Sequence, residues 1–290
     1  MTRALVLTAP APLSDADAAR AFAAAGCAAW RRLAPEAAEA EALDADRARL
    51  EAARAALAEA AVDANLVPVE GRHKRLLLAD MDSTIITVEC IDEIADFAGV
   101  KPQVAAVTEA AMRGELDFDG ALTERVALLA GLPEAALGQV WRERVRLSPG
   151  AATLVRTLGA LGVETALVSG GFTFFTERVA DAAGFASHRA NRLEVAEGRL
   201  TGRVIPPILG REAKRERLAA LCAELAIAPA QAVAIGDGAN DLAMVEAAGL
   251  GVAYRAKPAL AEAADARLDH SDLSALLHLM GVAPERWVRA

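Results

Sequence analysis

Two aspartates stand at the end of an apolar run in the segment RLLLADMDSTII, residues 75–86. Residues two apart on a strand point to the same side, so the carboxylates of Asp80 and Asp82 can approach one reactive centre unless the turn rotates one of them away. One carboxylate can attack an electrophile while its neighbour carries a proton. Taken alone, the pair fits an ordinary turn rich in Asp and Ser equally well.

Two further polar loops also follow apolar runs. The segment LVSGG places Ser169 and Gly170 between a strand and a helix, where a hydroxyl and free backbone N–H groups can hold an anion. The segment AIGDGANDLAM places Asp237 and Asp241 around Asn240, and such an acidic loop is costly unless a cation is bound. Ser-Gly turns are common, so neither loop alone indicates a site. Their occurrence in one chain together with the Asp80 and Asp82 pair does.

A lysine supplies the charge that these loops lack. Lys214, in the segment GREAKRERL, is by itself one more charge on a solvated helix face. Clustered carboxylates that must also accept a phosphate dianion need more positive charge than one metal ion supplies, which gives this lysine a role. The combined pattern predicts phosphoryl transfer: Asp80 attacks phosphorus to form an aspartyl phosphate, and Asp82 protonates the leaving alkoxide and later deprotonates water. We expect Mg²⁺ to be held by Asp80, Asp237 and a backbone carbonyl near Asp82.

The motifs DMDST, VSGG, the lysine of EAKRERL and GDGAND resemble, in order and spacing, those of the haloacid dehalogenase superfamily. The segment TVECIDEIA adds a closer similarity to the phosphoserine phosphatases of that superfamily, in which a glutamate occupies the position of Glu89. The resemblance covers about residues 75–272. It implies a three-layer, Rossmann-like α/β fold with a magnesium-dependent phosphatase site.

The resemblance also implies a role for each matching residue. Asp80 corresponds to the nucleophile and Asp82 to the acid and base, with Asp80, the Asp82 carbonyl and Asp237 as magnesium ligands. Asp241 corresponds to the residue that supports the metal loop from behind. The residues that correspond to substrate-binding positions are Ser169, Gly170, Lys214 and Asn240.

Two residues bear on which ester is cleaved. Glu89 resembles the family residue that meets a substrate ammonium, and Arg125 the one that meets a carboxylate, which suits its forked guanidinium. Simpler interpretations are a helix N-terminal acid for Glu89 and a surface pair with Glu124 or Glu115 for Arg125. The implied reaction is hydrolysis of L-phosphoserine in serine biosynthesis. Other small amino-alcohol or sugar phosphates are the alternative substrates, with phosphotransfer as an alternative outcome.

A non-catalytic binding protein of the same fold is the remaining rival. It predicts a missing catalytic aspartate, but Asp80, Asp82, Lys214 and Asp237 are all present. An enzyme is therefore expected.

The elements that position these residues form a regular alternation from residue 75 onward. The segments RLLLAD, VETALVS, AVAIGD and LGVAYR are apolar strands followed by turns and helical stretches, which indicates a parallel sheet covered on both faces. Ligands of such sheets bind beyond the carboxyl ends of the strands, where every polar residue named above falls. About 86 residues separate Asp82 from Ser169, so we expect an inserted helical cap at about 88–147 within a domain of residues 73–290. A β-hairpin is expected around Glu197-Gly198.

Residues 1–72 predict a small α+β domain, joined to the rest by the polar linker VEGRHKR. ALVLTAP and ANLVPVE indicate strands, and Ser14 caps the first of two Ala-rich helices. A βαββαβ unit needs one or two more strands around residues 39–46, where the pattern is weak. The domain resembles a reduced ACT-like module, for which ligand sensing, dimer contacts and shielding of the catalytic domain are equal alternatives.

Composition sets the broad class of protein. The chain has 290 residues with 54% hydrophobic and 24% charged, and no apolar run approaches the roughly 20 residues that span a bilayer. A net charge of -9 argues against nucleic-acid binding. Three scattered cysteines and the absence of an export signal favour a reducing cytoplasm. The expected partner is a small phosphate ester, with a homodimer as an open possibility.

Overall fold

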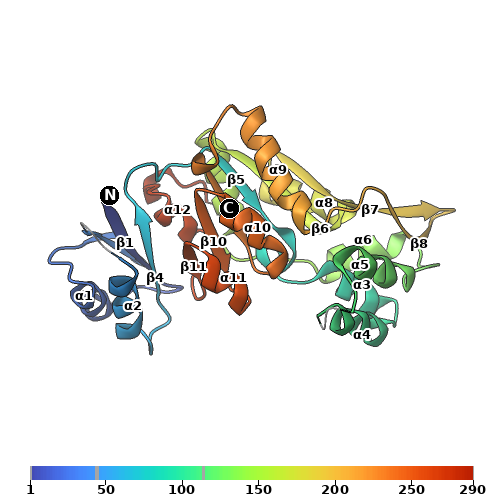
Figure 1. Cartoon of the computed structure of the whole chain (residues 1–290), viewed down its shortest axis with the longest axis horizontal. Coiled ribbons are helices and arrows are strands. Elements are labelled where there is room, and N and C mark those ends of the chain that lie inside the picture. Colours follow the sequence, from blue (N-terminus) through green and yellow to red (C-terminus); the bar gives the residue numbers. More distant parts are fainter. Residues whose placement is uncertain (1, 43–45, 113–114, 290) are drawn as a thin grey trace.

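The computed structural model describes residues 2–42, 46–112 and 115–289, and within them the strands form two sheets. A four-stranded sheet of order β2-β3-β1-β4 lies at one end of the molecule, and a seven-stranded sheet of order β11-β10-β9-β5-β6-β7-β8 lies in the middle (Figure 1). Helices α3 to α6 lie at the opposite end (Figure 1). Within the described ranges no helix is long and apolar enough to cross a membrane.

The larger sheet has a parallel centre because its strands are apolar on both faces. Leu76 and Leu78 of β5 pack in one cluster with α9, while Leu77 and Ala79 face the opposite cluster, as the two-residue period of a strand requires. The parallel strands are β5 (Leu76–Ala79), β6 (Glu164–Phe172), β7 (Ser187–Ala196), β9 (Ala232–Gly236), β10 (Leu250–Tyr254) and β11 (Ala266–Leu268). The covering helices are α9 (Arg211–Glu224), α10 (Leu242–Ala247) and α11 (Pro258–Ala263) on one face, and α7 (Ala151–Ala160), α8 (Thr173–Ala183) and α12 (Ala275–Leu279) on the other.

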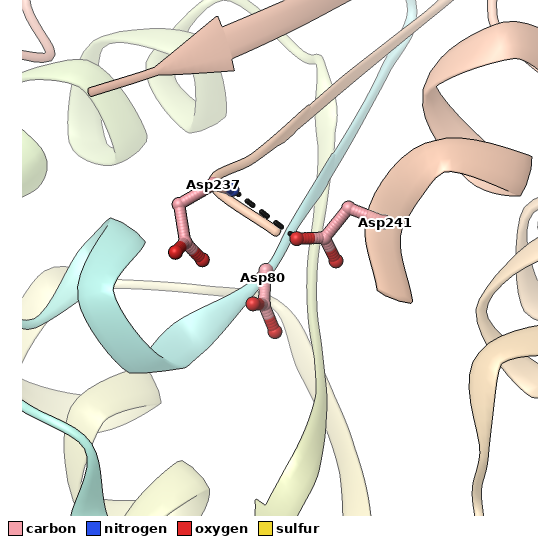
Figure 2. A group of neighbouring side chains, drawn as sticks. All are labelled: Asp80, Asp237 and Asp241. Atoms are coloured by element: carbon pink, nitrogen blue, oxygen red, sulfur yellow. Dashed lines mark hydrogen bonds between the residues drawn. The ribbon is translucent and has the colours of Figure 1, made fainter. Parts of the chain in front are cut away.

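The carboxyl ends of neighbouring strands meet at one edge of this sheet. β5 lies between β9 and β6, so the residues that follow these three strands converge. Asp80 follows β5 and Asp237 follows β9, and the two side chains lie close together (Figure 2). After Asp80 the chain makes a tight turn over Met81–Ile85, in which Ser83 has a positive φ of 54°.

Four helices are inserted between β5 and α7, within the range 88–147 that we call the cap. The chain leaves and returns at one place, because Ile86 forms an antiparallel bridge with Leu147 and the Ser148 N–H donates to the Ile85 carbonyl at 2.8 Å. A narrow connection of this kind leaves the cap as a separate helical layer above the site. Its helices are α3 (Cys90–Phe97), α4 (Lys101–Met112), α5 (Phe118–Ala127) and α6 (Ala135–Glu143).

The predicted β-hairpin is confirmed and also contacts the cap. β7 (Ser187–Ala196) and β8 (Arg199–Ile205) are antiparallel, and the two turn residues Glu197 and Gly198 have φ values of 52° and 71°. Backbone hydrogen bonds join Leu200 of β8 to cap residues 131 and 132, at 2.8 and 2.9 Å. The hairpin is therefore an extension of the cap as well as of the sheet.

The N-terminal unit contains more strands than its sequence pattern shows. Its order is β1 (Arg3–Thr8), α1 (Asp15–Ala24), β2 (Arg31–Ala34), β3 (Ala37–Ala42), α2 (Arg47–Ala56) and β4 (Asp63–Pro68), a βαββαβ arrangement. The middle strands begin before the range 39–46 in which they were sought, and residues 43–45 lie outside the described residues. Their sequence is Ala-rich and charged, without the β-branched residues that mark strands, so pairing with β1 rather than propensity forms β3. Ser14 caps α1 as expected.

Both faces of the N-terminal sheet are covered. Leu5 and Leu7 of β1 pack against α1 and α2, while Val6 joins the main core of the larger unit together with Leu276 and Leu277 of the α12 region. The segment predicted to be a linker is also fixed, since the guanidinium of Arg72 donates to the carbonyls of residues 278 and 279. The N-terminal unit is thus a packed layer of the molecule.

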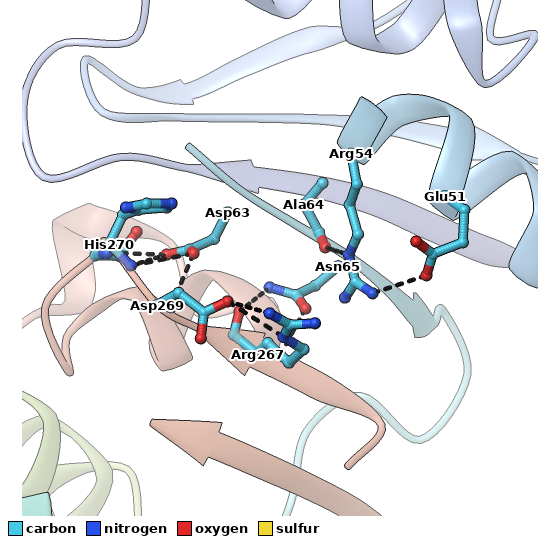
Figure 3. Close-up of polar contacts among 9 residues, drawn as sticks. Glu51, Arg54, Asp63, Ala64, Asn65, Arg267, Asp269 and His270 are labelled. Carbon is cyan, nitrogen blue, oxygen red and sulfur yellow. Dashed lines mark hydrogen bonds and ion pairs between the residues drawn. The ribbon is translucent and has the colours of Figure 1, made fainter. Parts of the chain in front are cut away.

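Two buried polar side chains of β4 complete the contact with β11 (Figure 3). The amide of Asn65 donates to the Arg267 carbonyl and accepts from the Arg267 N–H, both at 2.7 Å, and so imitates a paired strand. Asp63 accepts from the backbone N–H groups of residues 269–271. These bonds satisfy the outer edge of β11 from a segment 202 residues away in the sequence.

Substituting Asn65→Ala should destabilise the whole protein by about 2–4 kcal/mol, because it leaves the buried backbone N–H and carbonyl of Arg267 unpaired. Urea unfolding followed by circular dichroism measures the change. Glu51→Ala, which removes a surface ion pair with Arg54, is the control and should change stability by less than about 0.5 kcal/mol. Equal effects of the two substitutions would show that the Asn65 contact contributes nothing specific.

Candidate active site

A buried lysine links two of the strand ends. The Lys214 ammonium, from the first turns of α9, lies 2.6 Å from Asp80 Oδ1 and 2.5 Å from Asp241 Oδ1. All three residues are at most 3% exposed. Burial lowers the pKa of Lys214, but the two carboxylates outweigh burial and raise it, so the lysine is charged. Asp80 is 134 positions from Lys214 in the sequence, and Asp241 is 27 positions from it, and the fold brings the three into one ion-paired cluster.

One lysine does not balance the negative charge of this cluster. Burial, followed by the charge of Asp241, raises the pKa of Asp80 well above its usual value even though Lys214 opposes the shift. Burial and Asp241 likewise raise the pKa of Asp237 to about 6. A further cation bound between these carboxylates would lower both pKa values and favour their ionised forms.

The oxygen atoms available fit a hard divalent ion. Asp80, Asp237 and Asp241 each offer one carboxylate oxygen, and these oxygens lie within 4.8 Å of one another (Figure 2). Asp241 is already occupied: Oδ1 accepts from Lys214, and Oδ2 accepts from the N–H groups of Asp237 and Gly238. Asp80 and Asp237 are therefore the carboxylates free to hold an ion, and Asp241 shapes the loop behind them.

Asp82 has surroundings different from those of Asp80. Its Oδ1 accepts from the Cys90 N–H at 2.8 Å, and its Oδ2 accepts from the Ser169 hydroxyl at 3.1 Å. Burial, and then the charge of Glu89, raise the pKa of Asp82 to about 6. A carboxyl group of this kind can both give and take a proton near neutral pH.

The end of β6 forms the next wall. Ser169 and Gly170, expected from the sequence between a strand and a helix, lie within this strand, where its register against β7 shifts between Val168 and Phe172. The Ser169 hydroxyl accepts from the Gly171 N–H at 2.8 Å, and the Gly170 carbonyl accepts from the amide of Asn191 at 2.8 Å. Asn191 is 1% exposed and also accepts from the Leu209 N–H, so it ties this end of β6 to the start of α9. The sequence analysis missed Asn191, which stands within an ordinary strand pattern and carries no motif.

Glu89 and Arg125 lie in the same cavity but on different parts of the cap. Glu89 precedes α3 and accepts a 2.6 Å hydrogen bond from the Ser83 hydroxyl. Arg125 lies on α5, half-buried. Burial lowers the pKa of Arg125, while the negative charges of Asp92, Glu89 and Asp82 act in the opposite sense.

A cavity of about 510 Å³ brings the predicted residues together. Lys214 and Asp241 do not line it: Lys214 donates to Asp80 from behind, and Asp241 accepts from Lys214. Phe118 of the cap, Arg211 and Lys257 also face the cavity and were not identified from the sequence. The predicted residues that line it are Asp80, Asp82, Glu89, Arg125, Ser169, Gly170, Asp237 and Asn240.

Comparison with known proteins agrees with this geometry. A family model described as haloacid dehalogenase-like hydrolase matches residues 77–246, and the chain belongs to this family. A phosphoserine phosphatase from Polaromonas sp. is 50% identical over 211 residues, covering 71% of this chain and 89% of that protein. Within the family the chain therefore falls among the phosphoserine phosphatases, which are phosphoric monoester hydrolases. The predicted family and α/β fold are confirmed.

Solved structures extend the similarity to the N-terminal unit. A probable phosphoserine phosphatase from Vibrio cholerae, in unliganded form, has a TM-score of 0.82 at 33% identity and covers 98% of this chain and 88% of that chain. A phospho-aspartyl intermediate analogue of phosphoserine phosphatase has a TM-score of 0.66 at 39% identity and covers 71% of this chain and 98% of that chain. The whole arrangement of this chain thus recurs in a solved relative.

Gly171→Ala should abolish most activity without unfolding the protein. A Cβ at this position would lie 2.7 Å from Asp82 Oδ2 and 3.0 Å from the Ser169 hydroxyl, so Asp82 must move. A misplacement of this size costs on the order of 100-fold in kcat/KM, measured by phosphate release. Gly159→Ala on α7 is the matched control, because nothing lies within 4 Å of its added Cβ, and it should retain activity. Full activity in Gly171→Ala would mean that the position of Asp82 does not matter for turnover.

Proposed function

We propose that the protein hydrolyses L-phosphoserine to L-serine and phosphate, with Mg²⁺, through an aspartyl phosphate on Asp80. The observation that carries the proposal is one cavity in which Asp80 and Asp82 lie at the floor and Glu89 and Arg125 on the walls. The floor supplies the groups for phosphoryl transfer. The walls supply one fixed charge of each sign, as a small zwitterion requires.

In the first step a carboxylate oxygen of Asp80 attacks phosphorus. Oδ1 is held by Lys214, which leaves Oδ2 to form the new P–O bond. The bond from phosphorus to the serine oxygen breaks, and Asp82 gives its proton to that oxygen. A carboxyl group with a pKa of about 6 can hold this proton in the free enzyme.

In the second step water replaces the aspartate. Asp82, now ionised, takes a proton from the water, whose oxygen attacks phosphorus and releases the Asp80 carboxylate. The hydrogen bonds from Cys90 and Ser169 hold Asp82 in position for both transfers. The products are phosphate and the starting form of the enzyme.

The anionic phosphate needs positive and hydrogen-bonding partners. When bound, Mg²⁺ supplies positive charge to the phosphate oxygens, and Asp80, Asp237 and the backbone carbonyl of Asp82 are the groups to hold it. Lys214 contributes the charge beneath the nucleophile, where water is excluded and electrostatic interactions are strong. Ser169, the Gly170 N–H and Asn240 contact the remaining oxygens.

The cap supplies selection and shielding. Glu89 would bind the substrate ammonium and Arg125 its carboxylate through the two arms of the guanidinium. The cap would close over bound substrate and exclude water. The biological setting that we propose is the last step of serine biosynthesis in the cytoplasm.

Phosphate release from L-phosphoserine is the direct test. Activity should require Mg²⁺, disappear with EDTA, and fall at least about 1,000-fold in Asp80→Asn, because the amide is not a nucleophile. Asp181→Asn, an exposed aspartate on α8, is the control and should behave as the wild type. Activity that survives either chelation or Asp80→Asn would exclude this mechanism.

The walls of the cavity determine the preference among esters. Glu89→Gln and Arg125→Ala should each lower kcat/KM for L-phosphoserine by about 10- to 100-fold, since a charged partner is left unpaired, but should change p-nitrophenyl phosphate hydrolysis little. Glu124→Gln, which alters the exposed neighbour of Arg125, serves as control. An unchanged ratio of the two kcat/KM values would favour another small phosphate ester as substrate.

A further inference from the structure

Arg211 is a cation of the cavity to which the proposed mechanism assigns no task. It is the first residue of α9, exposed, and faces the cavity. Three residues further on lies Lys214, so the two side chains share one face of the helix. Lys214 reaches the nucleophile, and Arg211 lies one turn closer to the outside.

The position of α9 places Arg211 at the mouth, where the cap meets the core. A Cβ on the preceding Gly210 would lie 3.2 Å from Phe118 and 3.4 Å from Asp119, both in the first turn of α5. Arg211 therefore begins its helix directly against the cap. In the described part of the chain it makes no ion pair, whereas Arg215 on the same helix pairs with Glu212.

The charges around the cavity explain why a free cation is useful there. Five acidic side chains and three basic ones line it. Arg125 is half-buried near the negative charges of Asp92, Glu89 and Asp82. The backbone N–H of Lys257 donates to the Asp237 carbonyl at 2.8 Å, and the positive charge of its exposed side chain acts on the Asp237 carboxylate. A positive charge at the entrance lowers the electrostatic free energy of a doubly negative phosphate ester that approaches this acidic lining. The acidic lining side chains are Asp80, Asp82, Glu89, Asp117 and Asp237.

Helix stability does not explain an arginine at this position. The first turn of a helix carries a partial positive charge. An exposed cation there is therefore less favourable, by about 0.3–1 kcal/mol, than one at the carboxyl end of the helix. Helix stability alone would favour an acidic or neutral residue. The arginine thus stands at the end of the helix that is unfavourable for a cation, and it lines the substrate cavity.

We propose that Arg211 is a substrate-attracting residue that draws doubly charged phosphate esters into the cavity. This proposal rests on the proposed phosphatase function, but it concerns the phosphate charge and not the serine part of the substrate. It applies to p-nitrophenyl phosphate as well as to L-phosphoserine.

The experiment compares kcat/KM of wild type, Arg211→Gln, Arg211→Lys and the control Arg215→Gln at low and high KCl, with both substrates and saturating Mg²⁺. Loss of one charge that acts on a dianion across about 8 Å of water should lower kcat/KM about fivefold at low salt in Arg211→Gln. The difference should shrink to less than about twofold at about 0.5 M KCl, where charges are screened. Arg211→Lys and Arg215→Gln should stay close to wild type, and the melting temperature of Arg211→Gln should equal or exceed that of wild type.

Three outcomes would overturn the proposal. The first is an unchanged kcat/KM in Arg211→Gln, and the second is a loss that persists at high salt. The third is a loss in Arg211→Gln that affects kcat alone and that Asp117→Asn reproduces. Such a result would mean that Arg211 acts through a contact with the cap and does not attract the substrate. A wild type that hydrolyses p-nitrophenyl phosphate but not L-phosphoserine would refute the substrate assignment alone, since the Arg211 comparison proceeds with the first ester.

Discussion

The contact of one buried ammonium group with two buried carboxylates is the constraint on which the site depends. Lys214 holds Asp80 at 2.6 Å and Asp241 at 2.5 Å in a place that solvent does not reach. Removing one partner of such a buried pair costs about 3–5 kcal/mol, because an uncompensated charge remains. Three segments are therefore fixed relative to one another before any substrate arrives, and catalysis by electrostatic preorganisation needs this condition.

The sheet makes that contact possible. β5 has β9 on one side and β6 on the other, so Asp80, Asp237 and Ser169 lie together at the carboxyl-terminal edge of the sheet. Their strands are buried on both faces, which gives these residues a rigid base. In the proposed mechanism the sheet carries the groups for phosphoryl transfer, and the cap adds the groups that recognise the part of the substrate that is not phosphate.

The surroundings of a residue could be predicted where its neighbours in the sequence determine them. Asp80 and Asp237 directly follow strands that are apolar throughout, and Glu197-Gly198 fits a two-residue hairpin turn, so their neighbourhoods could be foreseen. Asn65 and Asn191 could not be foreseen, because each acts on backbone groups of a distant segment and its own strand gives no sign of the partner. β2 and β3 were poorly marked for a related reason: their alanines and charges have little strand propensity, and tertiary pairing decides. The roles of the individual site residues remain predictions.

The bonds between the hairpin and the cap have a mechanical meaning. The cap is attached to the rest of the protein at two places. One is the bridge between Ile86 and Leu147, and the other is β8, which is hydrogen-bonded to the cap. Asn191 lies on β7, the strand partner of β8. A cap that is attached at two places can rotate relative to the core only about the line that joins them. Because the Asn191 amide donates to the Gly170 carbonyl, an outward rotation of the cap would displace the end of β6 that we propose to face the phosphate. Opening of the cap and release of the phosphate product would then be coupled, and product release would need no separate conformational change.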